Sequence, residues 1–129
     1  MTSWPGAGDR GAAVAEFALV AALASLMFAA VLQLGYALHV HNTATAHVIE
    51  GARVGARAGN TTDEGAARAA ELLGTSLSAR YASAVSARRT IVGGVEVVEV
   101  EAALPVPLVG PLGPSQSMTV TGQAFAEDQ

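Results

Sequence analysis

The sequence contains no cysteine and no lysine, and it has few charged residues of either sign. Without cysteine the chain has no disulfide framework and no thiolate chemistry. Charged residues make up 14% of the 129 residues, and the net charge of −4 offers no basic surface for nucleic acid. We therefore predict no nucleic-acid partner. A chain of this length has room for at most one small domain.

Residue patterns typical of catalysis are also missing. No nucleophile, base and orienting group stand in a recognisable arrangement, so we predict no enzyme activity, no cofactor and no small-molecule substrate. His39, His41 and His47 are the only group with the character of metal ligands. On a helix these side chains point in different directions, and no further cluster completes the usual three or four ligands. We therefore predict no metal site.

Apolar residues make up 51% of the chain, and an uncharged run extends from Phe17 to Leu38. A helix over this run is about 33 Å long, enough to cross the hydrocarbon core of a membrane. We predict one span in contact with membrane lipid, because so short a chain has little else with which to cover such a helix. Arg10 precedes the run, which favours a cytoplasmic N-terminus with the bulk of the chain outside.

Glu16 is the one carboxylate at the front edge of this run. A charge at such a position is a functional hypothesis by default, although the side chain can also reach back to the interface. If the chain is cut after Gly11, Ala12 carries a new α-amine, and Glu16 follows one helical turn later on the same face. Glu16 can then pair with its own amine or with that of a neighbouring subunit.

The segment RGAAVAEFALV, Arg10 to Val20, resembles a type IV prepilin-type (class III) signal: a short hydrophilic leader, a glycine, a glutamate five residues on and an apolar run. The pair Glu16–Phe17 is similar to the Tad/Flp branch of that superfamily. The segment HVIEGARVGARAGNT, His47 to Thr61, resembles the region after the membrane helix in TadE-like proteins, minor pseudopilins of tight-adherence pili. The resemblance covers roughly residues 9–61, and the histidine cluster is not a feature that we associate with the family.

The resemblance implies processing at Gly11 and Ala12 by a prepilin peptidase, with Glu16 and Phe17 completing the recognised segment. It implies a structural subunit of a pilus assembly or secretion system, with other pilin or pseudopilin subunits as partners. The protein is then expected in the bacterial inner (cytoplasmic) membrane or incorporated into a pilus. Two alternatives stay open: an uncleaved single-span protein whose outer domain binds an envelope partner, and a secreted protein released at Ala46.

Small residues recur at every fourth position in two places. Within the apolar run these are Ala21, Ser25 and Ala29, and beyond it Gly51 and Gly55, followed by Gly59. Such seams allow helices to approach closely, and glycine costs about 1 kcal/mol relative to alanine inside a helix. We predict helix packing at these positions, with an Ala- and Gly-rich composition as the alternative explanation.

The remaining sequence predicts an α+β fold. The first helix continues to about Gly59, and Thr61 with Glu64 forms a capping box for a second helix that runs to about Ala82. The buried side of this second helix is predicted to contain four apolar residues, Ala66, Ala70, Leu73 and Leu77.

Two strands are predicted on either side of the turn Gly93–Gly94, with a bulge at Val97–Val98, an extended loop over residues 105–114 and a third strand over 117–126. The three strands form a small antiparallel sheet. We predict a leader over 1–11, a transmembrane and stalk helix over 12–59, and a small extracytoplasmic α+β region over 60–129.

Overall fold

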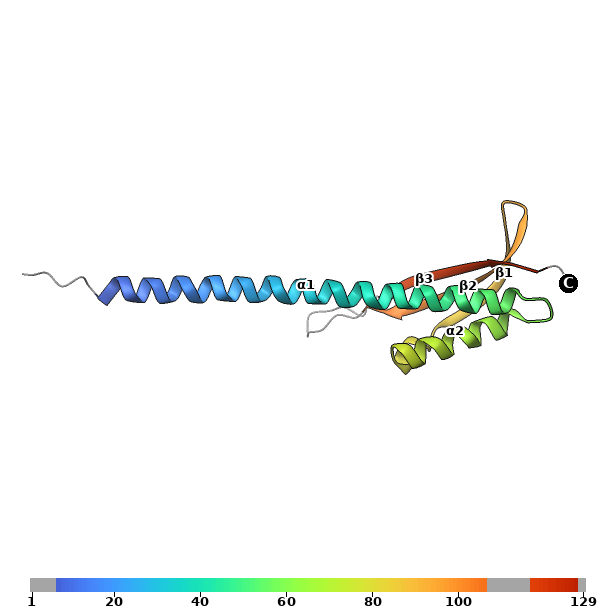
Figure 1. The fold of residues 1–129 in the computed structure, drawn as a ribbon, viewed down its shortest axis with the longest axis horizontal. Coiled ribbons are helices and arrows are strands. Elements are labelled where there is room, and N and C mark those ends of the chain that lie inside the picture. Colours follow the sequence, from blue (N-terminus) through green and yellow to red (C-terminus); the bar gives the residue numbers. More distant parts are fainter. Residues whose placement is uncertain (1–6, 107–116, 128–129) are drawn as a thin grey trace, which may run out of the picture. The chain divides into compact units, whose positions relative to one another are not determined.

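The computed structural model describes residues 7–106 and 117–127. Its elements are α1 (Ala7–Ala56), α2 (Thr62–Ser76), the short 3₁₀ helix η1 (Ala79–Tyr81), β1 (Val85–Val92), β2 (Val95–Pro105) and β3 (Ser117–Phe125) (Figure 1). This order confirms the predicted α+β fold. Most of the loop predicted over residues 105–114 lies outside the described residues.

The chain divides into two compact units, Met1–Gly35 and Tyr36–Gln129, and α1 contributes residues to both. The predicted domain scheme places one helix over residues 12–59, whereas the second half of α1 belongs to the same compact unit as α2 and the sheet. The leader and the extracytoplasmic assignment stay predictions.

The second unit has one hydrophobic core, to which α1 contributes a stripe of residues four positions apart. Val40, Ala44, Val48 and Ala52 are fully buried. A spacing of four keeps these side chains on one face of the helix. The other elements contribute the remaining buried members, Ala69, Leu73, Tyr81, Val100, Ala102, Leu104 and Val120. The sheet therefore depends on the two helices for its core, as a sheet of this size requires.

The sheet is antiparallel with the order β1-β2-β3. Gly93 and Gly94 both have positive φ angles, 61° and 84°, and Val92 pairs with Val95 across them. Positive φ at both central residues is the requirement of a two-residue type I′ turn, so the predicted hairpin is confirmed.

The predicted bulge at Val97–Val98 is wrong. The pairing of β1 with β2 runs one to one from Val92 with Val95 to Val85 with Ala102, without an extra residue on either strand. Val97 and Val98 point to opposite faces and both are buried. Val98 joins the core face, whereas Val97 is covered on the other face, where its strand partners are Thr90 and Phe125.

The capping box of α2 is confirmed, its predicted end is wrong, and its predicted face is right at Leu73 and Leu77 but wrong at Ala66 and Ala70. The Thr61 hydroxyl accepts a hydrogen bond from the Glu64 N–H at 3.2 Å, and the Glu64 carboxylate accepts one from the Thr61 N–H at 2.7 Å. The helix ends at Ser76, because Ser78 is extended and η1 then carries Tyr81 into the core.

The buried face of α2 consists of Gly65, Ala69 and Leu73, one position away from the predicted set at its first two members. Contact with α1 sets this rotation, since the backbones of the two helices meet at Gly51 and Gly65.

Candidate functional site

The residues of the predicted processing segment lie on exposed helical surface near the start of α1. Gly11, Ala12, Glu16 and Phe17 are all exposed, Phe17 to 74%. A Cβ atom added to Gly11 meets no heavy atom within 4 Å. Glu16 follows Ala12 by one helical turn and makes no hydrogen bond or ion pair with any residue that the structure describes. The segment is thus unobstructed by the described part of the chain.

The apolar run of α1 is also exposed. Within the described residues there is one helix that is long and apolar enough to cross a membrane, and none of its most apolar 18-residue window is buried. Leu23, Leu26 and Phe28 are each more than 60% exposed. The apolar run is therefore not the core helix of this fold, and its surface is of the kind that lipid or partner helices cover.

The small residues of the run lie on this same exposed surface. The Ser25 hydroxyl donates a hydrogen bond of 2.8 Å to the Ala21 carbonyl oxygen, one turn earlier. The one polar group of the ridge formed by Ala21, Ser25 and Ala29 is thereby satisfied within the helix. Such a ridge can enter an apolar environment without losing a hydrogen bond to water.

Gly51 and Gly55 lie instead inside the second unit, against α2. A Cβ atom on Gly51 would stand 2.6 Å from the Gly65 carbonyl oxygen and 2.7 Å from the Ala69 Cβ. A Cβ atom on Gly65 would in turn stand 2.7 Å from the Gly51 carbonyl oxygen. The two helix backbones are in direct contact, which only glycine allows at these positions. Gly59 lies outside this contact and has a φ of +84° in the turn that follows α1.

Two further glycines of this packing are absent from the predicted set, Gly65 and Gly122. A Cβ atom on Gly122 would lie 2.5 Å from the Ile49 backbone nitrogen, so β3 rests directly on the backbone of α1. The sequence did contain a signal for it, because Gly122 interrupts the alternation of the strand TVTGQAF, and a glycine inside a strand often marks close backbone approach.

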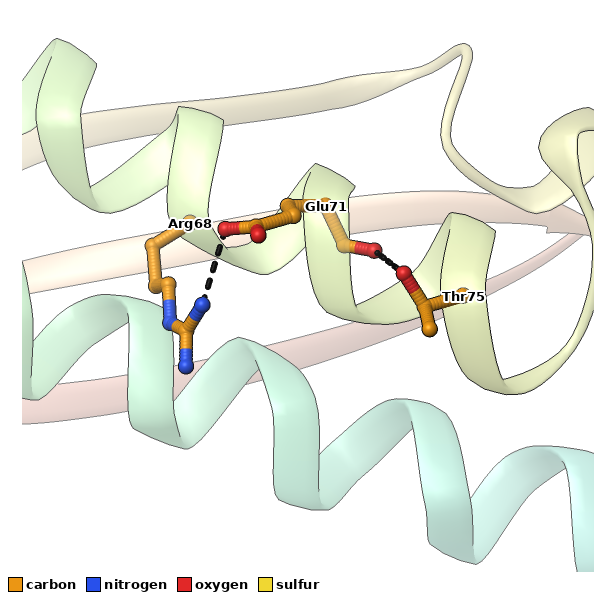
Figure 2. A network of polar contacts seen from close by, with 3 residues as sticks. All are labelled: Arg68, Glu71 and Thr75. Carbon is orange, nitrogen blue, oxygen red and sulfur yellow. Dashed lines mark hydrogen bonds and ion pairs between the residues drawn. The ribbon is translucent and has the colours of Figure 1, made fainter.

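His47 joins α1 to the end of α2. Its Nε2 atom lies 2.9 Å from the Ser76 hydroxyl oxygen. Burial lowers the pKa of His47 below its ordinary value, and the positive charge of Arg68 lowers it further. Arg68 itself pairs with Glu71 at 2.8 Å, and the Glu71 carbonyl oxygen accepts a hydrogen bond from Thr75 (Figure 2).

The other two histidines, His39 and His41, are exposed. Over residues 7–106 and 117–127 no three side chains of the types His, Cys, Asp and Glu are grouped as metal ligands. The structure therefore does not bring the three histidines into a common site.

The face of the sheet opposite the core carries a polar row across all three strands. Arg88, Glu99 and Gln123 are register partners on β1, β2 and β3. Arg88 forms an ion pair with Glu99, and the Gln123 amide donates a hydrogen bond of 2.6 Å to the same carboxylate. Cross-strand pairs of this kind stabilise a sheet, so the row has a structural role and accounts for the one buried carboxylate of β2.

Within the part of the chain that the structure describes, these features define one candidate membrane-spanning helix and a small α+β unit. Residues 11–53 match the family model described as TadE-like protein. This match confirms the resemblance to TadE-like proteins of the Tad/Flp system and suggests a Tad pilus-related protein; the family is a structural, pilus-associated one that is not known for enzymatic activity. No curated protein and no solved structure matches the chain.

Proposed function

We propose that the protein is a minor pilin-like (pseudopilin) structural subunit of a Tad/Flp-type pilus assembly or secretion system. The observation that supports this most directly is the family match, which begins at Gly11 and extends over the whole exposed apolar run. The start of the match coincides with the glycine after which the sequence predicts cleavage. The proposed role is one of packing and needs no catalytic group.

In this proposal a prepilin peptidase cuts the chain between Gly11 and Ala12. The open surroundings of Gly11 support access of the peptidase to this bond. The new α-amine on Ala12 has an ordinary pKa of about 7.7–8.0 and is largely charged at neutral pH. Glu16 lies one turn away without a partner among the described residues, so its carboxylate is available for that amine or for the amine of a neighbouring subunit.

The apolar run then holds the subunit in the inner membrane, with the N-terminus in the cytoplasm and the second unit outside. Its ridge of Ala21, Ser25 and Ala29 is the surface that we assign to packing against helices of other pilin subunits. Small side chains bring helix backbones together in lipid, and the internal hydrogen bond of Ser25 leaves no polar group unsatisfied there.

Intact-mass analysis tests the proposal in a bacterial host that has an active Tad prepilin peptidase. The wild-type chain is expected to start at Ala12, and Gly11→Val is expected to accumulate as the full-length precursor because the scissile position accepts only a minimal side chain. Gly8→Val, which places the same side chain on a glycine three positions upstream, is the matched control and is expected to be processed normally.

The state of the host's own major pilin shows whether the peptidase is active. An unshortened wild-type chain beside a fully processed major pilin contradicts the proposal. That result would favour the alternative of an uncleaved single-span protein whose second unit binds an envelope partner.

A further inference from the structure

The end of β3 lies between two hollows of the second unit. The larger, about 510 Å³, extends to Arg53 in the last turn of α1 and to Arg57 just after it. The smaller, about 260 Å³, extends to Val92 and Val97. Both are lined by Gln123, Ala124 and Phe125. The Phe125 side chain borders both hollows, and 73% of its surface is exposed. An exposed aromatic residue flanked by hollows is typical of a protein-binding surface.

The larger hollow is positively charged although the chain as a whole is acidic. Arg53 is exposed in the last turn of α1, and Arg57 is exposed directly after the end of the helix at Ala56. Neither guanidinium group makes an ion pair or hydrogen bond with any described residue. Glu127 is the one acidic residue that lines the hollow, and its carboxylate already accepts a hydrogen bond from the Ala58 N–H at 3.2 Å.

The backbone edge of β3 beside this hollow is unpaired. β3 pairs with β2 alone in the three-stranded sheet that the structure describes. It runs along α1 in the same direction, because Gly122 rests on Ile49 and the Glu127 N–H donates a hydrogen bond of 2.8 Å to the Ala56 carbonyl oxygen (Figure 1). A strand added at this edge would therefore lie beside the end of α1, where Arg53 and Arg57 are found.

The distance between the two arginines determines which positions of an added strand would carry acidic residues. Because residues 53–56 are helical, the backbone of Arg57 lies about 6 Å beyond that of Arg53 along the axis of α1. Alternate residues of a strand are about 6.6 Å apart and point to the same face. Two acidic residues separated by one position therefore match Arg53 and Arg57, while the intervening apolar side chain faces the other side of the strand, toward Phe125.

We propose that this surface binds an extended acidic segment of another protein, which adds a fourth strand beside β3. This chain contains such an alternation of acidic and apolar residues at Glu99 and Glu101. These residues lie in β2, which is already paired on both edges. A second copy cannot supply that pattern without opening its own sheet. The occupant is therefore a different protein, and the inference stands whether or not the chain is cleaved after Gly11.

Fluorescence anisotropy tests the proposal with the full chain in detergent micelles and a labelled octapeptide that alternates Glu and Val. The octapeptide is expected to bind, and an octapeptide that alternates Lys and Val is not. Arg53→Gln combined with Arg57→Gln is expected to weaken binding about tenfold or more, and added salt to weaken binding to the wild type. Phe125→Ala is expected to weaken binding several-fold while the protein stays folded, because the ring is mostly exposed.

Arg68→Gln combined with Arg80→Gln makes the same change in net charge on α2 and η1, and it is the matched control. Hydrogen exchange supplies the second measurement, since a paired strand protects the backbone amides of Ser117–Phe125. Equal loss of binding in both double variants, or binding without protection of β3, overturns the proposal. So does the absence of binding. Light scattering tests for a dimer of the wild type. A dimer that dissociates when Arg53 and Arg57 are changed also overturns the proposal, because the occupant would then be a second copy of the chain.

Discussion

In the first unit α1 leaves Leu23, Leu26 and Phe28 exposed to 61%, 68% and 66%, whereas in the second unit the same helix buries Val40 and Val48 completely. The sequence explains the change. Before Gly35 apolar residues surround the helix on all sides, and after it polar residues alternate with a stripe of buried ones four positions apart. One helix therefore has two different surfaces, one suited to lipid and one to a protein core.

The difference predicts that the same substitution lowers stability in the second unit and leaves it unchanged in the first. Leu73→Ala removes a fully buried side chain from the core, and we expect it to lower the free energy of unfolding of the second unit by about 2–5 kcal/mol. Leu23→Ala makes the same change on the exposed surface of the first unit and is expected to leave that stability unchanged. Thermal unfolding of the full chain in detergent, followed by circular dichroism, measures both. A loss of similar size in the two variants would remove the distinction between the units.

Glycine substitutions test the same difference between the two units through the backbone. We expect Gly122→Ala to destabilise the second unit by about 1–3 kcal/mol, because its Cβ atom collides with the backbone of α1 at Val48 and Ile49. Gly35→Ala adds the same methyl group where no heavy atom lies within 4 Å, and it is the control. The unfolding midpoint in urea compares the two, and an unchanged midpoint in Gly122→Ala would show that β3 can move away from α1 at little cost.

Local patterns predicted the features that depend on local chemistry. Thr61 and Glu64 formed the expected capping box because each satisfies an N–H group of the other's backbone. Gly93 and Gly94 formed the expected hairpin because both accept positive φ angles. Each outcome depends on residues adjacent in the chain, so the spacing alone was sufficient.

Features that depend on distant contacts were mispredicted or missed. The hydrophobic pattern continued α2 to Ala82, but the core accepts Tyr81 only if the helix stops at Ser76. Val97 suggested a bulge because its cover on the outer face comes from residues far away in the sequence. Gly65 and Gly122 are required by the approach of α1, and of these two only Gly122 left a local signal, as an interruption of the strand pattern. Arg53 and Arg57 left none, because their common hollow forms only once β3 lies beside α1.

The processing residues differ from both groups. Gly11, Ala12, Glu16 and Phe17 were selected by their spacing relative to an apolar run, and folding brings no distant residue of the described chain to Gly11. Their predicted role depends on a peptidase and on partner subunits. The fold of a single chain therefore neither supports nor contradicts that role. The family match over residues 11–53 includes all four.

The smallest expected effect is the pH dependence that the second unit owes to His47. Burial and then Arg68 lower the pKa of this histidine in the folded state, so below about pH 6.5 the unfolded chain binds more protons than the folded one. The stability that depends on neutral His47 is therefore fully present above about pH 6.5, and it is lost as the pH drops toward the lowered pKa. The first unit, Met1–Gly35, cannot contribute to this dependence through a histidine, because His39 is the first histidine in the chain.

Urea unfolding at about pH 7.5 and about pH 5.5 measures this contribution. We expect His47→Gln to lose less stability than the wild type between the two pH values, because the glutamine keeps a polar group near Ser76 and does not titrate. His41→Gln removes an exposed histidine from the same helix, and the dependence due to His47 is expected to persist in it. The wild type and His47→Gln differ in no other ionisable group, so the difference between these two proteins isolates His47. An equal loss in the wild type and His47→Gln would mean that the contact between α1 and α2 accepts a charged imidazole, with Ser76 and water compensating for its burial.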